Sequence, residues 1–360
     1  MKKLILKGMD GRYLSDKIVK WYKANKRSLP WRDTTDPYKI WLSEIILQQT
    51  RVNQGLPYYQ EFIKQYPNIE ALANARLQQV LRLWQGLGYY TRARNLHQCA
   101  KAVVENHGGK FPKTFEKLLT LPGIGHYTAA AIASFAFGEA VAVVDGNVFR
   151  VLSRLFGIDI PVNTPEAKKK FTLLANELIS QKNPALHNQA MMEFGATFCT
   201  PVNPKCDDCP FKDACFAYNH ELVSALPVKN RKKKSRNRYF FYFVVEKNNR
   251  LLMRKRQERD IWHGLFDFAL LENNQPVNID KLIAKNPMGK WLNKTSPLTI
   301  SKKYRHILSH QVIHCRFIQL KANRDFKPPE KELAFYSARQ IAKLPKSALI
   351  SRFLNELNAR

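Results

Sequence analysis

Residues 115–137 read FEKLLTLPGIGHYTAAAIASFAF, and this stretch decides the fold of the first two thirds of the chain. Its centre, Leu121-Pro122-Gly123-Ile124-Gly125, separates two segments with helical spacing of apolar residues, Phe115–Thr120 and Tyr127–Phe137. Glycines allow the positive φ angles of a tight turn. The exposed N–H groups that open the second helix favour an anion. The stretch therefore predicts a helix–hairpin–helix that clamps a phosphate backbone, with an ordinary interhelical loop as the alternative.

Helical periodicity extends outward from this hairpin, from Leu14 to about Tyr218. The segment Lys229–Arg238 is almost entirely basic and polar and cannot build a core, so it reads as a linker. Beyond it, short aromatic or β-branched runs predict strands, and two segments look helical. The expected strands are Tyr239–Val245, Arg250–Met253 and Phe266–Leu270, and the expected helices are Ile279–Ala284 and Ser347–Leu357.

We therefore expect a multi-domain protein with an all-α domain followed by an α+β domain. The expected boundaries are residues 1–226 for the helical domain, 227–238 for the basic linker and 239–360 for the second domain.

The charge balance points to a polyanion. The chain has 59 Lys plus Arg against 29 Asp plus Glu, a formal net charge of +30, and DNA carries two charges per base pair. A solvated basic surface and an anionic membrane are the alternatives. No apolar run reaches the roughly 20 residues of a membrane helix, and the first residues do not form a signal peptide. We expect a soluble, cytoplasmic, nucleoid-associated monomer.

Four of the six cysteines, Cys199, Cys206, Cys209 and Cys215, have the spacing C-x6-C-x2-C-x5-C. Four thiolates so close in sequence can surround zinc or an iron–sulfur cluster, with ordinary buried cysteines as the alternative. Structural zinc sites usually pair two C-x2-C knuckles, and only one is present here, which favours the larger cluster in a structural role. For the isolated Cys99 and Cys315, buried inert thiols are the favoured interpretation.

Two carboxylates are candidates for chemistry. Asp145 ends the apolar run Val141–Val144 and precedes an amphipathic helix, where it is either a simple N-cap or an anion whose pKa the helix dipole lowers. Glu44 shares a helix face with Trp41 and Leu47. It is either a solvated surface residue or a desolvated acid with a raised pKa. One acid and one stabilising anion are what cleavage of a glycosidic bond requires.

Several motifs together resemble the MutY-type adenine DNA glycosylases, and the resemblance extends over essentially the whole chain. They are Leu29-Pro30-Trp31-Arg32, the Glu44 segment ending Leu47-Gln48-Gln49-Thr50, Gly86-Leu87-Gly88-Tyr89-Tyr90, the hairpin, Val144-Asp145-Gly146-Asn147 and the cysteine spacing. The resemblance implies a two-lobed helical domain with the site in its cleft, a [4Fe–4S] cluster and a C-terminal domain that recognises 8-oxoguanine opposite the adenine. Its substrate would be duplex DNA with adenine opposite 8-oxoguanine or guanine.

The resemblance also implies roles for individual residues. Glu44 would protonate N7 of an adenine flipped out of the stack, Asp145 would stabilise or trap the cationic sugar, and Asn147 would orient Asp145. The base pocket would involve Trp31, Leu47, Gln189 and Met192, the vacated stack Gln49 and Tyr89, and the opposite base Thr50. The other expected DNA contacts are Arg27, Leu87, Gly123 and Gly125, with a monovalent or divalent cation at the hairpin and no nucleotide cofactor.

Tyr127 stands where related strand-nicking glycosylases have a lysine that forms a Schiff base. A phenol cannot form that imine, so we expect a monofunctional enzyme. The alternatives are an oxidised-pyrimidine glycosylase with lyase activity, which Tyr127 disfavours, and a non-catalytic DNA-binding protein, which the presence of both Glu44 and Asp145 disfavours.

The second domain resembles the Nudix fold. After Gly264-Leu265-Phe266-Asp267, the segment Leu271–Pro276 supplies one Glu and a Pro instead of a helix with several metal-binding glutamates, so pyrophosphohydrolase activity is disfavoured. His306-Ile307-Leu308-Ser309-His310 resembles the loop that reads 8-oxoguanine through a hydroxyl beside a His, here Ser309 and His310. The family usually has an aromatic residue in place of Leu308. An ordinary strand turn is the alternative.

Overall fold

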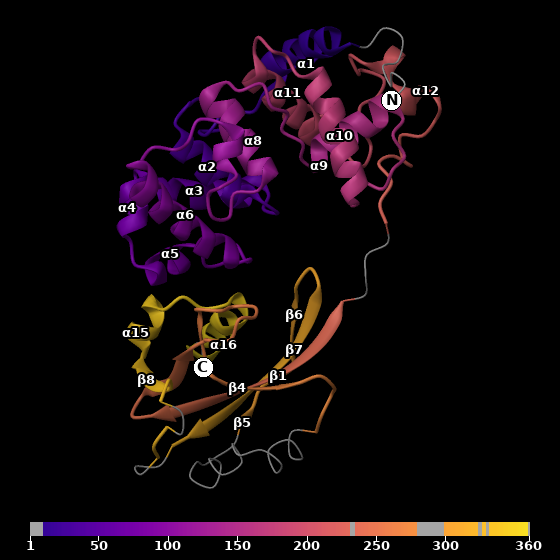
Figure 1. Ribbon diagram of the computed structural model, residues 1–360. Coiled ribbons are helices and arrows are strands. Elements are labelled where there is room, and N and C mark those ends of the chain that lie inside the picture. Colours follow the sequence, from indigo (N-terminus) through magenta and orange to yellow (C-terminus); the bar gives the residue numbers. More distant parts are fainter. Residues whose placement is uncertain (1–9, 231–234, 279–298, 323–325, 329–330, 359–360) are drawn as a thin grey trace. The chain divides into compact units, whose positions relative to one another are not determined.

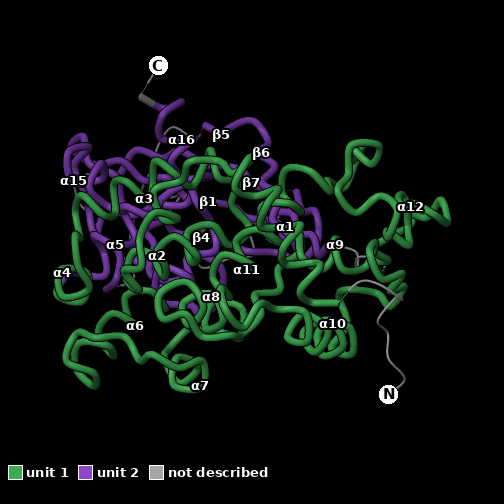
Figure 2. The backbone as a smooth tube through the Cα atoms, turned by 90° about the horizontal axis from the view of Figure 1, so that it is seen from above, with its two compact units in different colours: residues 1–74, 95–231 green, residues 75–94, 232–360 purple. Residues whose placement is uncertain are grey.

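The computed structural model describes residues 10–230, 235–278, 299–322, 326–328 and 331–358. The chain forms two compact units (Figure 2). Unit 1 comprises Met1–Asn74 and Asn95–Arg231, and unit 2 comprises Ala75–Arg94 and Lys232–Arg360. The segment Ala75–Arg94 thus belongs with the C-terminal unit, although the predicted helical domain, residues 1–226, includes it.

Unit 1 is helical, as the apolar periodicity predicted (Figure 1). Several of its helices begin at an Asp or Thr whose side chain accepts a backbone N–H of the first turn, which satisfies donors that would otherwise lack a partner. Its elements are α1 (Gly11–Asn25), α2 (Pro37–Leu47), α3 (Val52–Gln65), α4 (Ile69–Asn74), α6 (Thr91–His107), which begins in unit 2, α7 (Phe115–Leu118), α8 (His126–Phe137), α9 (Gly146–Phe156), α10 (Pro165–Leu178), α11 (Pro184–Thr197), the 3-10 turn η1 (Lys212–Ala214) and α12 (Phe216–Asn219).

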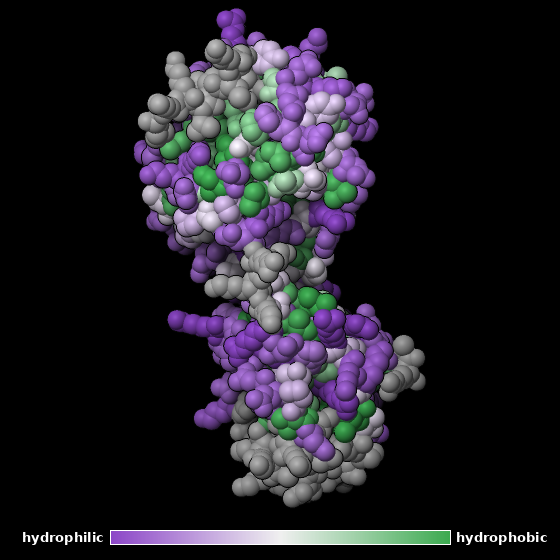
Figure 3. Space-filling view, turned by 90° about the vertical axis from the view of Figure 1, so that its right-hand side faces the viewer, coloured by the Kyte–Doolittle hydropathy of each residue, from purple (hydrophilic) through white to green (hydrophobic). Residues whose placement is uncertain are grey.

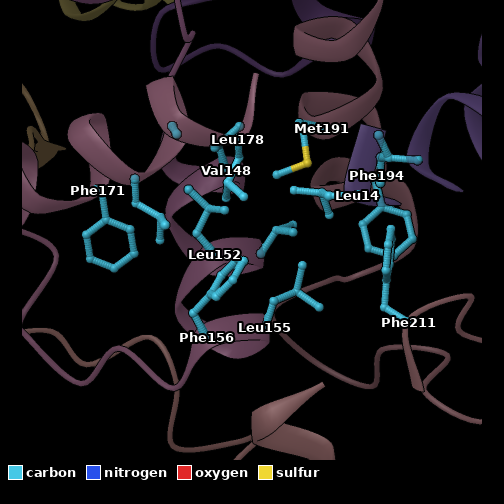
Figure 4. Packing of buried hydrophobic residues seen from close by; sticks show 14 of the residues in the cluster. Leu14, Val148, Leu152, Leu155, Phe156, Phe171, Leu178, Met191, Phe194 and Phe211 are labelled. Atoms are coloured by element: carbon cyan, nitrogen blue, oxygen red, sulfur yellow. The ribbon is translucent and has the colours of Figure 1, made fainter. Parts of the chain in front are cut away.

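The main core of unit 1 lies between α1, α9, α10 and α11 (Figure 4). Leu14, Leu152, Phe171 and Phe194, one from each of these helices, are at most 1% exposed. Burying one such side chain stabilises the fold by roughly 1.5–3 kcal/mol. This packing fixes α9 against α11, the two helices that carry several of the predicted site residues.

The hairpin has the predicted form. It connects α7 to α8, and Gly125 is the N-cap of α8. Gly123 has a φ of 74°, and a Cβ there would come within 2.5 Å of the Cβ of Asn95, so both the backbone conformation and the close approach require glycine.

Unit 2 is built on an eight-stranded sheet in which β1 and β7 run parallel at the centre. Strands β2 and β4 pair with β1, β5 and β6 pair with β7, and β3 and β8 pair with β2. The described elements are α5 (Leu77–Leu83), β1 (Arg236–Lys247), β2 (Arg250–Lys255), β3 (Phe266–Asp267), β4 (Ala269–Asn273), β5 (Thr299–Ile300), β6 (Tyr304–Ile307), β7 (Gln311–Lys321), β8 (Ala334–Ser337), α15 (Ala338–Lys343) and α16 (Ala348–Asn358).

Unit 2 differs from the expected strands in two places. Strand β1 begins at Arg236, inside the segment predicted as linker, because it pairs with β7 from the first residue, Arg236 with Gln311. The expected strand Phe266–Leu270 is divided into β3 and β4, which pair with different neighbours. The expected helix Ser347–Leu357 is confirmed as α16, whereas Ile279–Ala284 lies outside the described residues.

Hydrogen bonds attach the segment Ala75–Arg94 to the rest of unit 2. The Tyr90 hydroxyl donates to the carbonyl of Lys346 at 3.1 Å. Arg94 Nη1 donates to the carbonyl of His263 at 2.8 Å, and Gln85 Nε2 donates to Ser351 Oγ at 2.9 Å. Hydrogen bonds to residues 263, 346 and 351 of unit 2 therefore fix the segment that contains the glycine-rich turn 86–90.

Candidate active site

Glu44 and Asp145 line the same cavity in unit 1, which has a volume of about 200 Å3. The C-terminal half of α2 contributes Glu44, and the N-cap of α9 contributes Asp145. Tyr127, in the first turn of α8 directly after the hairpin, lies between them in sequence and lines the cavity as well. The consecutive helices α8 and α9 and the sequence-distant α2 thus bring two acids and a phenol together.

Glu44 is buried, with 7% of its surface exposed. Burial raises the pKa of its carboxyl group to about 7, and the negative charge of Asp145 acts in the same direction. The Tyr127 hydroxyl donates to Glu44 Oε2 at 2.6 Å and works against this shift. A carboxyl group with a pKa near 7 can hold a proton at neutral pH and still release it.

Of the two interpretations that its sequence position allowed, the structure confirms that Asp145 is an N-cap. It is the N-cap of α9, since Oδ1 accepts the backbone N–H of Asn147 at 2.9 Å and of Val148 at 2.8 Å. Asn147 Nδ2 donates to Oδ2 at 2.8 Å. The expected lowering of its pKa is wrong in direction: burial raises the pKa, and the three hydrogen bonds and Arg150 offset this only in part.

A third carboxylate, which the sequence analysis missed, also lines the cavity. Glu193 is fully buried, and its oxygens accept hydrogen bonds from Arg27 Nε at 2.7 Å, Arg27 Nη2 at 2.6 Å and Arg32 Nη2 at 2.6 Å. Burial opposes ionisation, but these arginines lower the pKa of Glu193 to about 2. Glu193 lies one helical turn after the predicted Gln189 on α11, and this i, i+4 spacing was the available signal.

The structure brings most of the predicted unit 1 residues to this cavity. The ones that line it are Arg27, Trp31, Glu44, Leu47, Thr50, Tyr127, Asp145, Asn147, Gln189 and Met192. Gln49 does not line it; it lies in the turn after α2 with a φ of 58°. Gly123 and Gly125 are exposed in the hairpin. The Tyr22 hydroxyl donates to Gln189 Oε1 at 2.9 Å and fixes that side chain.

A chain of hydrogen bonds leads from the cavity to the cysteine loop. Asn147, which donates to Asp145, accepts a hydrogen bond from Arg150 Nη2 at its Oδ1, at 2.9 Å. Arg150 Nε donates to the backbone carbonyl of Cys199 at 2.8 Å. One turn later, Arg154 Nη1 lies 3.4 Å from Cys199 Sγ. Helix α9 therefore connects the carboxylate at its N-terminus with the first cysteine of the loop.

The four cysteines of this loop line one small cavity, and none of them is in a disulfide. Burial, together with the neighbouring sulfurs, raises the pKa of the Cys209 thiol to about 12. Four thiolates in this space therefore need a cationic centre, which the irons of a cluster supply. Among the described residues no three His, Cys, Asp or Glu side chains converge to hold a single ion. An iron–sulfur cluster would be held by these four cysteines and would supply the positive charge that stabilises their thiolates.

Unit 2 contains a second, larger cavity of about 740 Å3. It is lined by the predicted residues Leu87, Tyr89, Ser309 and His310, and Ser309 Oγ lies 3.2 Å from His310 Nδ1. The other lining residues that carry charge or aromatic surface were not predicted from the sequence. These are Arg94, Arg259, Asp260, Trp262 and His263. Leu308, which stands where the family usually has an aromatic residue, lines the cavity too.

Family models match three parts of the chain. Residues 42–177 match the HhH-GPD superfamily of base excision DNA repair proteins, and residues 199–215, from the first to the last clustered cysteine, match the iron–sulfur binding domain of endonuclease III. Residues 241–356 match the NUDIX domain. The predicted iron–sulfur cluster and the Nudix-like second domain are thereby confirmed.

Similar proteins cover most of the chain. An adenine DNA glycosylase of Buchnera aphidicola subsp. Baizongia pistaciae is 36% identical over 85% of this chain and 86% of its own. The adenine DNA glycosylase of Homo sapiens is 44% identical over 56% of this chain and 38% of its own. A thermostable thymine-DNA glycosylase, 31% identical, superimposes with a TM-score of 0.54 over 58% of this chain and 97% of its own.

Proposed function

Because the chain belongs to the adenine DNA glycosylases, base excision repair enzymes of the HhH-GPD superfamily, we propose that its substrate is adenine paired with 8-oxoguanine or guanine in duplex DNA. We propose further that it releases the base by hydrolysis and leaves the strand intact. The observation that carries the proposal is the shared cavity of Glu44 and Asp145, with Tyr127 bonded to Glu44.

In the proposed reaction Glu44 is the general acid. The adenine enters the unit 1 cavity, where the protonated Glu44 transfers its proton to N7 of the base. The bond between C1′ of the sugar and N9 then breaks, and its electron pair leaves with the adenine. A pKa near 7 suits this step, because general acids work best near the pH at which they operate.

Asp145 is proposed to meet the positive charge that develops on the sugar, either as an ion partner or by forming a transient bond to C1′. The donors Asn147 N, Val148 N and Asn147 Nδ2 hold its oxygens in place. Water finally attacks C1′ and displaces Asp145 as the free carboxylate where the two have bonded; its oxygen stays on the sugar as the hydroxyl, and one proton returns to the site. Fixed charge aimed at a developing cation is usually the largest contribution to catalysis of this kind.

Arg27, Arg32 and Glu193 are proposed to form the polar wall of the base pocket. Glu193 stays ionised because both arginines bond to it, and the Arg27 side chain remains 41% exposed. Trp31, Leu47 and Met192 supply apolar surface around this charge cluster. A flat, polar-edged base such as adenine fits apolar surface combined with a few fixed polar groups.

The cavity of unit 2 is proposed to receive the base opposite the adenine. Ser309 and His310 offer a hydroxyl and a ring nitrogen to that base, whereas Tyr89, 44% exposed at the same cavity, is proposed to fill the space that the adenine leaves in the stack. Leu308 offers less stacking area than an aromatic residue, so recognition is assigned to hydrogen bonds from Ser309.

Glycosylase assays on four duplexes test the substrate. Adenine is placed opposite 8-oxoguanine, guanine, cytosine or thymine, and alkali then reveals abasic sites. We expect cleavage after alkali for the first two duplexes and little for the others. Equal rates on all four duplexes would contradict the proposed recognition of the opposite base.

Glu44→Gln tests the acid. Loss of a general acid costs about 10²–10⁴-fold in rate, so base release should fall by that factor while the affinity for duplex changes little. A variant that releases adenine at the normal rate would remove Glu44 from the mechanism.

Tyr127 supports the proposal that the enzyme is monofunctional. An enzyme with lyase activity, such as an oxidised-pyrimidine glycosylase, forms a Schiff base that borohydride reduces to a stable protein–DNA adduct. We expect no stoichiometric adduct here. Tyr127, which hydrogen-bonds to Glu44, stands at the position of the Schiff-base lysine, and its phenol cannot form an imine. Trapping one equivalent of DNA would favour the lyase instead.

A further inference from the structure

The turn before α6 has an unusual backbone. Gly86 and Gly88 have φ angles of 107° and 71°, and Tyr89 follows with 46°. Tyrosine has a Cβ, so this left-handed conformation is strained, and such strain persists only where the surroundings impose it. Tyr89 is nevertheless 44% exposed at the unit 2 cavity. The Tyr89 ring therefore lines the cavity although the backbone of this residue has a conformation that tyrosine does not favour.

Trp84 and Arg92 supply the contacts that impose this conformation. The fully buried Trp84 donates its indole N–H to the carbonyl of Gly88 at 2.9 Å. The backbone N–H of Arg92 donates to the carbonyl of Tyr89 at 2.9 Å, and Arg92 Nη2 donates to the carbonyl of Leu87 at 3.4 Å. Three successive carbonyls of the turn are thus bonded to two side chains and one amide.

The Arg92 guanidinium also contacts both rings. Its Cζ lies 5.1 Å from the centroid of a Trp84 ring and 5.7 Å from that of the Tyr89 ring. Burial lowers the pKa of Arg92 to about 10, so the group is still charged at neutral pH. A cation over an aromatic face binds more strongly when it is partly desolvated. The planar group can contact two rings, which a lysine ammonium cannot do equally well.

We propose that Arg92 is a positioning residue: it holds the Tyr89 ring in the strained turn and so prepares that ring to fill the space that an extruded adenine leaves in the duplex. The contribution of Arg92 acts through Tyr89 and requires no contact of its own with DNA. The proposal rests on the proposed function, because the duplex is the partner of Tyr89.

Hydrogen–deuterium exchange of the free, cluster-loaded protein tests the positioning without any substrate. In Arg92→Met, which keeps side-chain length but loses the charge and the plane, the amides of residues 86–90 should exchange about tenfold faster, the value of a partly buried cation–π contact. The matched control is Arg339→Met, which removes an exposed charge on α15 of the same unit. Unchanged exchange in Arg92→Met would overturn the proposal.

A double-mutant cycle tests the consequence for DNA. In duplexes with 2-aminopurine in place of adenine, fluorescence reports extrusion of the base. Tyr89→Ala and Arg92→Met should each lower the fluorescence rise about tenfold, and the double variant should lose no more than the stronger single variant. Additive losses in the double variant would overturn the proposal. So would a loss of duplex affinity in Arg92→Met together with a decrease of about one in the slope of log affinity against log salt concentration, because that result would show a direct contact between Arg92 and a phosphate.

Arg92→Lys completes the design. It keeps the charge, and we expect it to recover only part of the slow exchange and of the extrusion, because the planar contact is lost. If Arg92→Met does not fold, as judged by circular dichroism and cluster absorbance, Arg92→Lys gives the same two measurements. Full recovery by lysine would contradict the proposed geometry. Wild-type protein that releases no adenine would refute the proposed function. The exchange experiment needs no substrate, so it would still show whether Arg92 holds the turn.

Discussion

At the scale of single residues, Glu44 acquires its character from its neighbours. Its carboxyl group would be ordinary in water; burial and the charge of Asp145 raise its pKa to about 7, while the Tyr127 hydroxyl opposes the shift. Asp145 is buried as well, but three donors surround it. The two acids thus differ mainly in the hydrogen bonds that each receives, and this difference supports their assignment as acid and anion.

The rate of base release should depend on pH in a predictable direction. Because Glu44 must be protonated to act, we expect the single-turnover rate to fall as the pH rises through about 7. Burial raises the pKa of Asp145, so protonation of this anion should lower the rate at acidic pH. A rate that stays constant from pH 6 to pH 9 would contradict the role of Glu44.

The free energy of unfolding should also depend on pH through Glu44. The folded pKa of Glu44, about 7, exceeds its ordinary value of 4.5, so the folded state binds the proton more tightly than the unfolded state. This contribution, about 3 kcal/mol, is fully present below pH 4.5 and is lost as the pH rises to about 7. Urea titrations at several pH values should show this loss in the wild type and its absence in Glu44→Gln.

Tyr127→Phe separates the two influences on the pKa of Glu44, burial, which raises it, and the hydrogen bond from Tyr127, which lowers it. Removing the hydroxyl removes a hydrogen bond that lowers the pKa of Glu44. The alkaline limb of the rate profile should therefore move to higher pH, and the ring should still fill its place. A limb that moves to lower pH would show that the phenol stabilises the protonated form instead.

At the scale of elements, the approach of α9 to α11 positions Asp145. These helices pack closely in the unit 1 core, with α10 beside them (Figure 1). Gly195 makes the approach feasible, because a Cβ there would lie 2.7 Å from the Cβ of Asn147 and 2.9 Å from its backbone oxygen. The same helix α9 bonds to the cysteine loop through Arg150, so the loop and the carboxylate share one support.

Gly195→Ala should therefore disturb both stability and chemistry. The added methyl group must displace the backbone near Asn147, at a cost of about 1–3 kcal/mol, and base release should slow as Asp145 moves. Gly146→Ala is the matched control, since a Cβ at that position, in the first turn of α9, meets no atom within 4 Å. Thermal unfolding and single-turnover assays of both variants measure the difference. Equal thermal stability and equal rates of base release in the two variants would contradict the claim that the close contact between α9 and α11 positions Asp145.

At the scale of the whole molecule, charge is the dominant property. The formal net charge is +30, and the described residues of the face in Figure 3 are largely hydrophilic, with hydrophobic side chains in small patches. Within the described chain, no helix combines the length and the apolar character that crossing a bilayer requires. The surplus of cations is suited to a phosphate backbone.

Affinity for duplex DNA should therefore depend steeply on salt. If six or more phosphates are neutralised, the affinity falls by about 10³-fold or more between 50 and 200 mM potassium chloride. Fluorescence anisotropy of a labelled duplex measures this slope. An affinity that hardly responds to salt would mean that the basic residues do not meet the DNA backbone.

The sequence by itself determined the features that local spacing encodes. The hairpin between α7 and α8, the cysteine spacing, the change from helices to strands and the N-cap position of Asp145 all follow from residues close together in the chain. Helical periodicity, glycine conformations and ligand spacing are local properties, so they need no knowledge of the fold.

Only the tertiary structure decided what depends on distant neighbours. It placed Tyr127 against Glu44, 83 residues away in sequence, bonded Glu193 to two arginines and attached the segment 75–94 to the sheet domain. It also reversed the expected pKa shift of Asp145. The physical reason is desolvation: the cost of burying a charge depends on every element packed around it, and the order of residues along the chain does not show those elements.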